Sequence, residues 1–131
     1  MIDLDHLKQV NDRHGHAAGD QLLRNLARCC RAQLGPGDLL GRLGGDEFCL
    51  ILPEADHQRA VDTAQRIASA LLSLPVSGQD HSLLSASFGA AAISDGDADY
   101  ESLLARADRA LYAAKRSGRG QVAGDPLSAT R

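Results

Sequence analysis

Apolar side chains recur at intervals of three and four residues in several stretches of the chain, a pattern typical of helices that bury one face. The clearest stripe follows Asp20, which we expect to cap the N-terminus of a helix. Its members are Leu22, Leu23, Leu26, Ala27 and Cys30. The same spacing, with Asp5 as the cap of the first helix, predicts four helices at about residues 6–13, 20–34, 55–74 and 100–117.

Shorter apolar runs without helical spacing predict the strands. The runs at 39–43 and 48–52 flank Gly44 and Gly45. A glycine pair between strand-like runs favours a tight hairpin, because glycine reaches positive φ without a steric clash. The second run is apolar at every position, which indicates an interior strand covered on both faces. The remaining strands are expected at 83–93 and at the opening Met1-Ile2.

The order of these elements, β-α-α-β-β-α-β-α, predicts an α/β protein of the α+β sandwich type, in which helices flank a mixed, mostly antiparallel sheet. The chain has 131 residues, 44% of them hydrophobic, which suits one globular domain with one core. We expect this domain to span residues 1–123 and residues 124–131 to form a flexible tail.

Composition and charge exclude several classes of protein. The net charge of −3, with two Tyr, two Phe and no Trp, argues against a nucleic-acid-binding protein. Three cysteines without a C-x-x-C spacing do not support a disulfide framework or a zinc site. No apolar run reaches the length of a membrane span, and the N-terminus does not resemble a signal peptide. The cytoplasm is therefore the expected compartment.

Two acidic clusters are the candidate chemistry of the chain. Asp46 and Glu47 follow the glycine pair at the tip of the predicted hairpin, and Asp3 and Asp5 end the opening strand. If these strands are neighbours, the clusters form a divalent-cation site of the kind that phosphoryl transfer requires. The alternatives are solvated acids on the hairpin and helix-capping groups at the start, and for Asp5 the cap is the preferred role.

Five blocks of residues carry a resemblance that covers nearly the whole chain. They are Asp3-Leu4-Asp5-His6-Leu7-Lys8 with Asn11-Asp12, then Gly15-His16 with Gly19-Asp20, Gly44-Gly45-Asp46-Glu47-Phe48, Ser87-Phe88-Gly89, and Ala107-Asp108-Arg109-Ala110-Leu111-Tyr112-Ala113-Ala114-Lys115 with Gly118-Arg119. In this order and spacing they resemble the GGDEF domain of diguanylate cyclases. Family members begin with a helix and a complete first strand. We therefore expect an N-terminally truncated domain that lacks the first helix and most of the first strand.

The resemblance implies a fold, an activity and partners. The fold is the palm-like fold of nucleotidyl cyclases. The activity is the condensation of two GTP molecules into cyclic di-GMP and pyrophosphate with Mg²⁺, for which Mn²⁺ is a possible substitute. Because each site holds one GTP, two chains must meet in a transient homodimer. An upstream sensory domain is expected in the full-length protein, and neither a nucleic acid nor a membrane is an expected partner of this chain.

The resemblance also implies roles for individual residues. Asp3, the backbone carbonyl of Leu4 and Asp46 resemble the metal ligands, and Asp46 and Glu47 resemble the catalytic acids. The substrate-binding residues are expected to be Lys8, Asn11, Asp20, Gly44, Gly45, Lys115 and Arg119. Among them, the carboxylate of Asp20 and the amide of Asn11 suit the edge of guanine. The cations suit the triphosphate, and the glycines leave room for the substrate.

Structural roles remain open for several of these residues. Asp20 is also a good N-cap, Asn11 is an ordinary polar residue of a helix, and Lys115 and Arg119 are expected near a helix C-terminus on electrostatic grounds. A second function also stays open. In it, the chain is a catalytically inactive, truncated fragment that acts as a GTP-binding or protein-interaction module, because a frayed first strand would leave Asp3 in poor ligand geometry.

Overall fold

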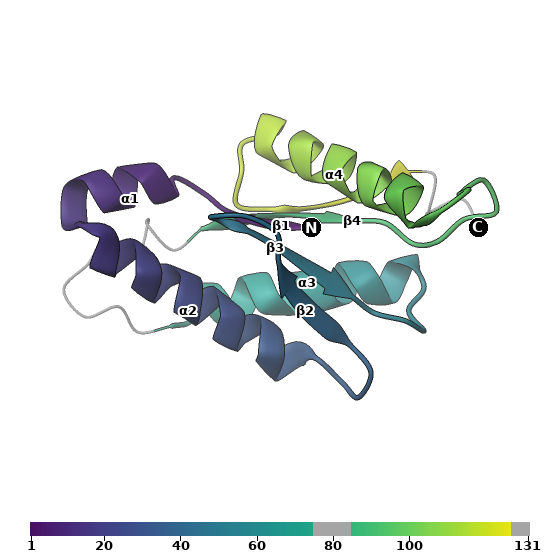
Figure 1. Ribbon diagram of the computed structural model, residues 1–131, viewed down its shortest axis with the longest axis horizontal. Helices are drawn as coiled ribbons and strands as arrows, with labels where there is room; N and C mark the ends of the chain where they lie inside the picture. The colour runs from purple at the N-terminus through teal and green to yellow at the C-terminus, as the bar shows by residue number, and fades with distance from the viewer. Residues whose placement is uncertain (75–84, 127–131) are drawn as a thin grey trace.

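The structure is a computed structural model that describes residues 1–74 and 85–126 (Figure 1). Its elements follow the order β1 α1 α2 β2 β3 α3 β4 α4 β5. The strands are β1 (Ile2–Leu4), β2 (Leu39–Arg42), β3 (Glu47–Ile51), β4 (Ala86–Ala90) and β5 (Val122–Gly124). The helices are α1 (Leu7–His14), α2 (His16–Gln33), α3 (His57–Leu72) and α4 (Tyr100–Arg116). The four helices and the glycine-centred hairpin are thus confirmed.

The strands form one sheet in the order β2-β3-β1-β4-β5. All neighbouring strands are antiparallel except β4 and β5, which are parallel. The mixed, mostly antiparallel sheet is confirmed, and so is the interior position of β3. The three-residue strand β1 lies in the centre, where it pairs with β3 on one side and with β4 on the other.

The helices cover both faces of this sheet, with α4 on one face and α2 and α3 on the other (Figure 1). Alternate residues of the central strands point to opposite faces. Ile2, Leu4, Phe48 and Phe88 join the core that contains Leu26 of α2 and Ile67 of α3, among other residues. The positions between them, including Asp3, therefore point toward α4. One face of the central strands supplies the core, and the other carries Asp3 and Ser87 beside Gly89, against which α4 packs.

Two helix starts differ from the sequence prediction. Asp5 does not cap α1: His6 is the N-cap, and no side chain caps the helix. Asp20 does not cap α2 either, because α2 begins at His16, directly after the single break at Gly15. Gly15 has φ 85°, which an L-residue rarely adopts, so one glycine is enough to separate two helices that pattern analysis places further apart.

The C-terminal end also differs from the prediction. Residues 122–124 form β5, which sequence analysis missed because three residues give no periodic signal. Asp125 is buried and forms an ion pair with Arg106 of α4, which also pairs with Asp97. Gly124 and Asp125, assigned to the flexible tail, thus belong to the packed structure, and residues 127–131 lie outside the described part of the chain.

Gly89 sets how closely α4 approaches the sheet. A Cβ placed on it would lie 2.2 Å from the backbone nitrogen of Leu111 and 2.3 Å from the carbonyl oxygen of Ala107. We expect Gly89→Ala to lower the free energy of unfolding by about 3 kcal/mol or more, because helix backbone cannot move aside cheaply. Denaturant unfolding measures this change.

Gly41→Ala is the matched control in the same sheet, because a Cβ at Gly41 meets nothing within 4 Å. This variant should gain about 0.5 kcal/mol from the lower entropy of its unfolded chain. Equal effects of the two substitutions would contradict the close approach of α4 to β4.

Candidate functional site

The central position of β1 brings the two acidic clusters together. In the β1–β3 register Asp3 lies opposite Glu47, and the backbone N–H of Leu4 donates to the carbonyl oxygen of Asp46 at 3.2 Å. The hairpin tip therefore meets the end of β1. We call Asp3 and Asp46 the acidic pair. Its two members are separated by more than forty positions in the sequence, and only the strand pairing makes them neighbours.

Asp3 is a buried carboxylate under electrostatic stress. It is 6% exposed, and its Oδ1 has no hydrogen-bond partner among the residues that the structure describes. Burial raises its pKa to about 6, a hydrogen bond from Lys115 opposes this rise, and the negative charge of Asp46 adds to it. A buried oxygen without a donor, beside a second carboxylate, suits a cation as partner.

Lys115 supplies the positive charge of the site. It lies in the last turn of α4, and its Nζ donates to Oδ2 of Asp3. Burial opposes its charged form, but the hydrogen bond to Asp3 and the charges of Asp3, Glu47 and Asp46 raise the pKa of Lys115 above its ordinary value. The ammonium group thus stays protonated and neutralises part of the acidic cluster.

The hairpin tip is held by Arg42. Its Nε donates to the carbonyl oxygen of Gly44 at 3.1 Å, and its Nη2 donates to that of Gly45 at 2.6 Å. The expected positive φ at these glycines is wrong, because neither adopts it. A Cβ would meet nothing within 4 Å at Gly45 and only Glu47 Oε2, at 3.9 Å, at Gly44. The backbone conformation therefore does not require glycine here. What Gly44 and Gly45 provide is open space at the hairpin tip.

Asn11 and Asp20 lie where α1 meets α2. A Cβ on Gly19, the residue before Asp20, would lie 1.9 Å from Oδ1 of Asn11, so Gly19 is what admits the amide. Oδ1 of Asn11 is buried and, within the described ranges, has no hydrogen-bond partner. Asp20 is exposed and lines a cavity of about 490 Å³ between α2 and the β2–β3 hairpin, with Arg24 and Arg42 among its other lining residues.

Lys8 and Arg119 are less closely tied to the acidic pair. Both side chains are exposed, on α1 and in the turn after α4, and neither takes part in the contact between Asp3 and Lys115. Arg119 follows Lys115 within one tight turn, where its backbone N–H donates to Ala114 O at 3.0 Å. The structure thus gathers Asp3, Asp46, Glu47 and Lys115 and leaves these two cations at the rim.

Asp5 is the residue whose structural part sequence reasoning missed. Its carboxylate accepts hydrogen bonds from Ser85 Oγ at 2.5 Å, Ser87 Oγ at 2.7 Å and the backbone N–H of Gly120 at 2.9 Å. The signal was the Ser-x-Ser spacing before Phe88, which places two hydroxyls on one face of an otherwise apolar strand. Buried hydroxyls need partners, and Asp5 is theirs.

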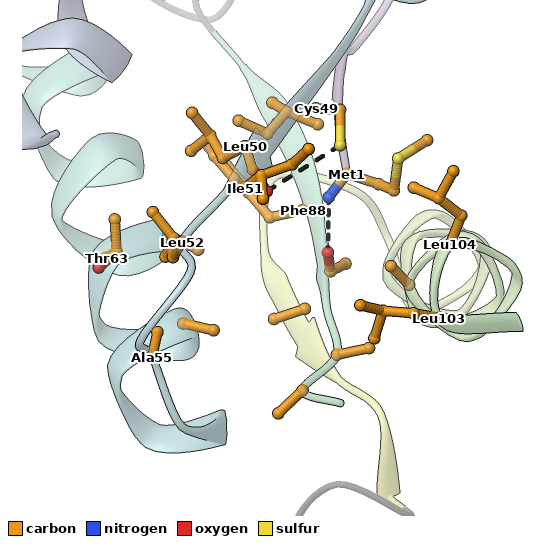
Figure 2. Close-up of a pocket in the computed structure, with 18 of the residues that line it drawn as sticks. Met1, Cys49, Leu50, Ile51, Leu52, Ala55, Thr63, Phe88, Leu103 and Leu104 are labelled. Atoms are coloured by element: carbon orange, nitrogen blue, oxygen red, sulfur yellow. Dashed lines mark hydrogen bonds between the residues drawn. The ribbon is translucent and has the colours of Figure 1, made fainter. Parts of the chain in front are cut away.

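A second pocket, of about 270 Å³, lies at the opposite end of β1 (Figure 2). Apolar side chains such as Leu50, Leu103 and Leu104 line it, and none of its lining residues carries a charged side chain. At its wall the α-amino group of Met1 donates to Gly89 O at 2.9 Å, and burial lowers the pKa of this amine. This pocket offers no group for phosphoryl chemistry, so the site at the acidic pair is the candidate.

Metal ligation by this site would draw on few side chains. Among the residues that the structure describes, no group of three or more His, Cys, Asp or Glu side chains is arranged to hold a metal ion. Asp3 and Asp46 supply two carboxylates, and further oxygens would come from the backbone and from a bound phosphate, as is usual for Mg²⁺.

In the same described ranges, no helix has the length and apolar composition that a membrane crossing requires.

Comparisons with known proteins identify the family. The family model described as "Diguanylate cyclase, GGDEF domain" matches residues 1–121. Among curated relatives, the Escherichia coli proteins "Probable diguanylate cyclase DgcE" and "Diguanylate cyclase DosC" are 45% and 40% identical over 124 residues, or 93% of this chain. The match spans 11% and 27% of their respective lengths. The chain belongs to the GGDEF domain family.

Solved structures support the same assignment. The GGDEF domain of DgcB from Caulobacter crescentus, in complex with c-di-GMP, has a TM-score of 0.87 at 33% identity and covers 95% of this chain and 74% of that one. The active GGEEF domain of a diguanylate cyclase from Vibrio cholerae has a TM-score of 0.86 at 31% identity, with 95% and 79% covered. The palm-like α/β architecture is therefore confirmed.

Lys115→Ala tests the electrostatics of the site. Removing the ammonium leaves the Asp3 carboxylate buried without its counter-charge, so we expect the free energy of unfolding near neutral pH to fall by about 1 to 3 kcal/mol. Lys8→Ala is the matched control, because Lys8 is exposed, and it should leave stability unchanged. Denaturant unfolding of both variants gives the comparison, and equal stability would contradict a structural contact between Lys115 and Asp3.

Proposed function

We propose that this chain is a diguanylate cyclase domain that condenses two GTP molecules into cyclic di-GMP and pyrophosphate. The observation that carries the proposal is the acidic pair, because a buried Asp3 beside Asp46 is the donor set that divalent-cation phosphoryl chemistry needs. Family membership supports the same reaction. The alternative of an inactive module rests on a frayed first strand, whereas β1 pairs on both sides and buries Asp3.

For the metal ion we propose Mg²⁺, held by Asp3, the backbone carbonyl of Leu4 and Asp46. Mn²⁺ prefers the same oxygen ligands and is a suitable substitute. The donorless oxygen of Asp3 supports this assignment. When bound, such an ion supplies charge neutralisation for the phosphates.

The remaining residues bind and orient the nucleotide. In this proposal the orphan amide oxygen of Asn11 and the carboxylate of Asp20 accept the N–H groups on the edge of guanine. Lys8, Lys115 and Arg119 neutralise the triphosphate. Gly44 and Gly45 let the substrate lie against the hairpin tip, where a Cβ would otherwise stand.

The chemical step needs a proton acceptor and a second substrate. Asp46 or Glu47 takes the proton of the 3′-hydroxyl as that oxygen attacks the α-phosphorus of the other GTP, and pyrophosphate leaves. Each chain offers one acidic pair and one pair of guanine-binding residues, Asn11 and Asp20. We therefore propose a transient homodimer in which two sites face each other. The protein then contributes alignment of the two nucleotides together with charge neutralisation. The cytoplasm, where GTP is found, is the proposed compartment.

Asp46→Asn should abolish turnover, with a loss of about 100-fold or more, because the amide can neither bind the metal as an anion nor accept the proton. The assay is the formation of cyclic di-GMP from GTP and Mg²⁺ by the purified chain, followed by chromatography. Asp62→Asn on α3 is the matched control, since Asp62 accepts a hydrogen bond from Gln58 Nε2, at 2.8 Å, that the amide oxygen of Asn also accepts. Retained turnover in Asp46→Asn would refute the assignment.

The raised pKa of Asp3 predicts how metal binding depends on pH. Because the pKa of Asp3 is about 6, mainly through burial, the protonated form predominates at lower pH and competes with the metal. We therefore expect the affinity for Mg²⁺ to fall by about tenfold per pH unit below this pKa and to level off above it. Calorimetric titrations with Mg²⁺ from about pH 5 to about pH 8 measure this, and a constant affinity would be inconsistent with Asp3 as a ligand.

A further inference from the structure

Asp5 forms a polar junction between three segments that are distant in the sequence. It is 4% exposed, and its carboxylate joins the end of β1 to Ser85 and Ser87 of the β4 region and to the backbone of Gly120. Its own backbone N–H donates to Ser85 O at 2.8 Å. Three donors from two distant segments meet on this one side chain, so the junction is a firm tie.

The backbone on both sides of this tie is strained. Within the described ranges, His6 at φ 60° and Arg119 at φ 64° are the only non-glycine residues with positive φ. Each is the direct neighbour of a residue in the hydrogen bond between Gly120 and Asp5. A left-handed conformation costs an L-residue about 1–2 kcal/mol and persists only where surrounding contacts hold it.

The strained turn after α4 directly follows the part of the helix that holds Lys115, the cation paired with Asp3. Lys115, whose ammonium donates to Asp3, precedes this turn by less than one helical turn, and Gly118 N donates to Lys115 O at 3.4 Å. Arg119 is exposed, and its direction from the turn depends on where Gly120 is fixed. Asp5, two residues after Asp3 at the end of β1, fixes Gly120 through the hydrogen bond from the Gly120 N–H to its carboxylate.

We propose that Asp5 is a positioning residue that holds the turn of residues 117–120 against the end of β1 and thereby aims Arg119 at the phosphates of the bound nucleotide. This inference rests on the proposed function, since it needs a nucleotide at the acidic pair. The role depends on hydrogen-bond acceptance by Asp5, not on its charge. Asn keeps an acceptor for Gly120 N–H, and serine hydroxyls reorient to suit an amide, so Asp5→Asn preserves the tie. Asp5→Ala removes the carboxylate and leaves Gly120 N–H only the longer hydrogen bond to Ser87 Oγ, at 3.2 Å.

The test combines two measurements on the whole chain. Hydrogen exchange of the Gly120 amide reports the tie itself, without any nucleotide. We expect protection of this amide in the wild type and in Asp5→Asn, and clearly faster exchange in Asp5→Ala, where Ser87 Oγ is the acceptor left to it. Calorimetric binding of GTP with Ca²⁺, which takes oxygen ligands, reports the consequence. Asp5→Ala and Arg119→Ala should each lower the affinity for GTP by about tenfold, and Asp5→Asn should lower it by less than about threefold. The Asp5→Ala/Arg119→Ala double variant should lose no more affinity than either single variant.

A second variant keeps the test decisive if Asp5→Ala folds poorly. Gly120 has φ 61°, and a Cβ on it would lie 3.1 Å from Ser85 Oγ, which donates to Asp5, so Gly120→Ala strains the turn at this junction while the Asp5 side chain is kept. It should weaken GTP as Asp5→Ala does, again with no further loss when Arg119 is alanine. Gly37→Ala is the control, because Gly37 also has positive φ, 86°, and a Cβ there meets nothing within 4 Å. It should leave GTP affinity unchanged.

The outcomes separate this inference from the proposed function. If the wild type binds GTP and Asp5→Ala binds it equally well, the inference is overturned and the proposed function stands. If the losses of affinity multiply in the double variant, Asp5 and Arg119 act independently and the inference is overturned. If Asp5→Asn loses as much affinity as Asp5→Ala, Asp5 acts through its charge, and the inference is overturned as well. If the wild type binds no GTP, the proposed function and the role of Arg119 both fall, whatever the protection of Gly120.

Discussion

The pairing of β1 with strands on both of its sides is the constraint on which the rest of the site depends. A three-residue strand has little stability of its own, but in the centre of the sheet its backbone groups are satisfied on two edges. The same pairing puts Ile2 and Leu4 into the core and turns Asp3 to the opposite face. A register shift of one residue would exchange these roles, burying the carboxylate in the core and exposing the apolar side chains toward α4.

The electrostatics of the site follow from that placement. Desolvation of Asp3 and the proximity of Asp46 both disfavour two negative charges, and Lys115 offsets only part of this cost. The acids Asp3, Asp46 and Glu47 therefore outnumber the cation Lys115, whose pKa they raise. Stability alone would favour an uncharged group at position 3, so the buried acid is best understood as a functional feature whose cost the surrounding sheet tolerates.

Much of the fold could be predicted from local sequence patterns. The hairpin of residues 39–52 and the helices α3 and α4 were accessible because apolar periodicity and glycine punctuation act within a few residues. The caps were not. Asp5 and Asp20 have the chemistry of N-caps, but Asp5 is drawn into tertiary hydrogen bonds with Ser85, Ser87 and Gly120, and Gly15 allows α2 to begin before Asp20. Tertiary contacts outweigh a capping preference of about 1 kcal/mol.

The candidate site also has a part that the sequence predicts and a part that it does not. The proximity of Asp3 and Asp46 could be predicted from their position at predicted strand ends, because strand neighbours are few. The tie from Asp5 to Gly120 spans 115 positions and depends on a turn whose geometry no local pattern records. The hydrogen bonds from Arg42 to the carbonyl groups of Gly44 and Gly45 show the same limit, since the glycine pair predicts a turn but not what holds it.

The most direct test of the account is a Mn²⁺ titration of the ¹⁵N-labelled chain followed by nuclear magnetic resonance. Paramagnetic broadening marks the amides nearest to the bound ion. If one cation is shared across the two strand ends, the signals of Asp3 and Leu4 and those of Asp46 and Glu47 broaden together, at the same low Mn²⁺ concentrations. Broadening at only one strand end, or at neither, would contradict the account.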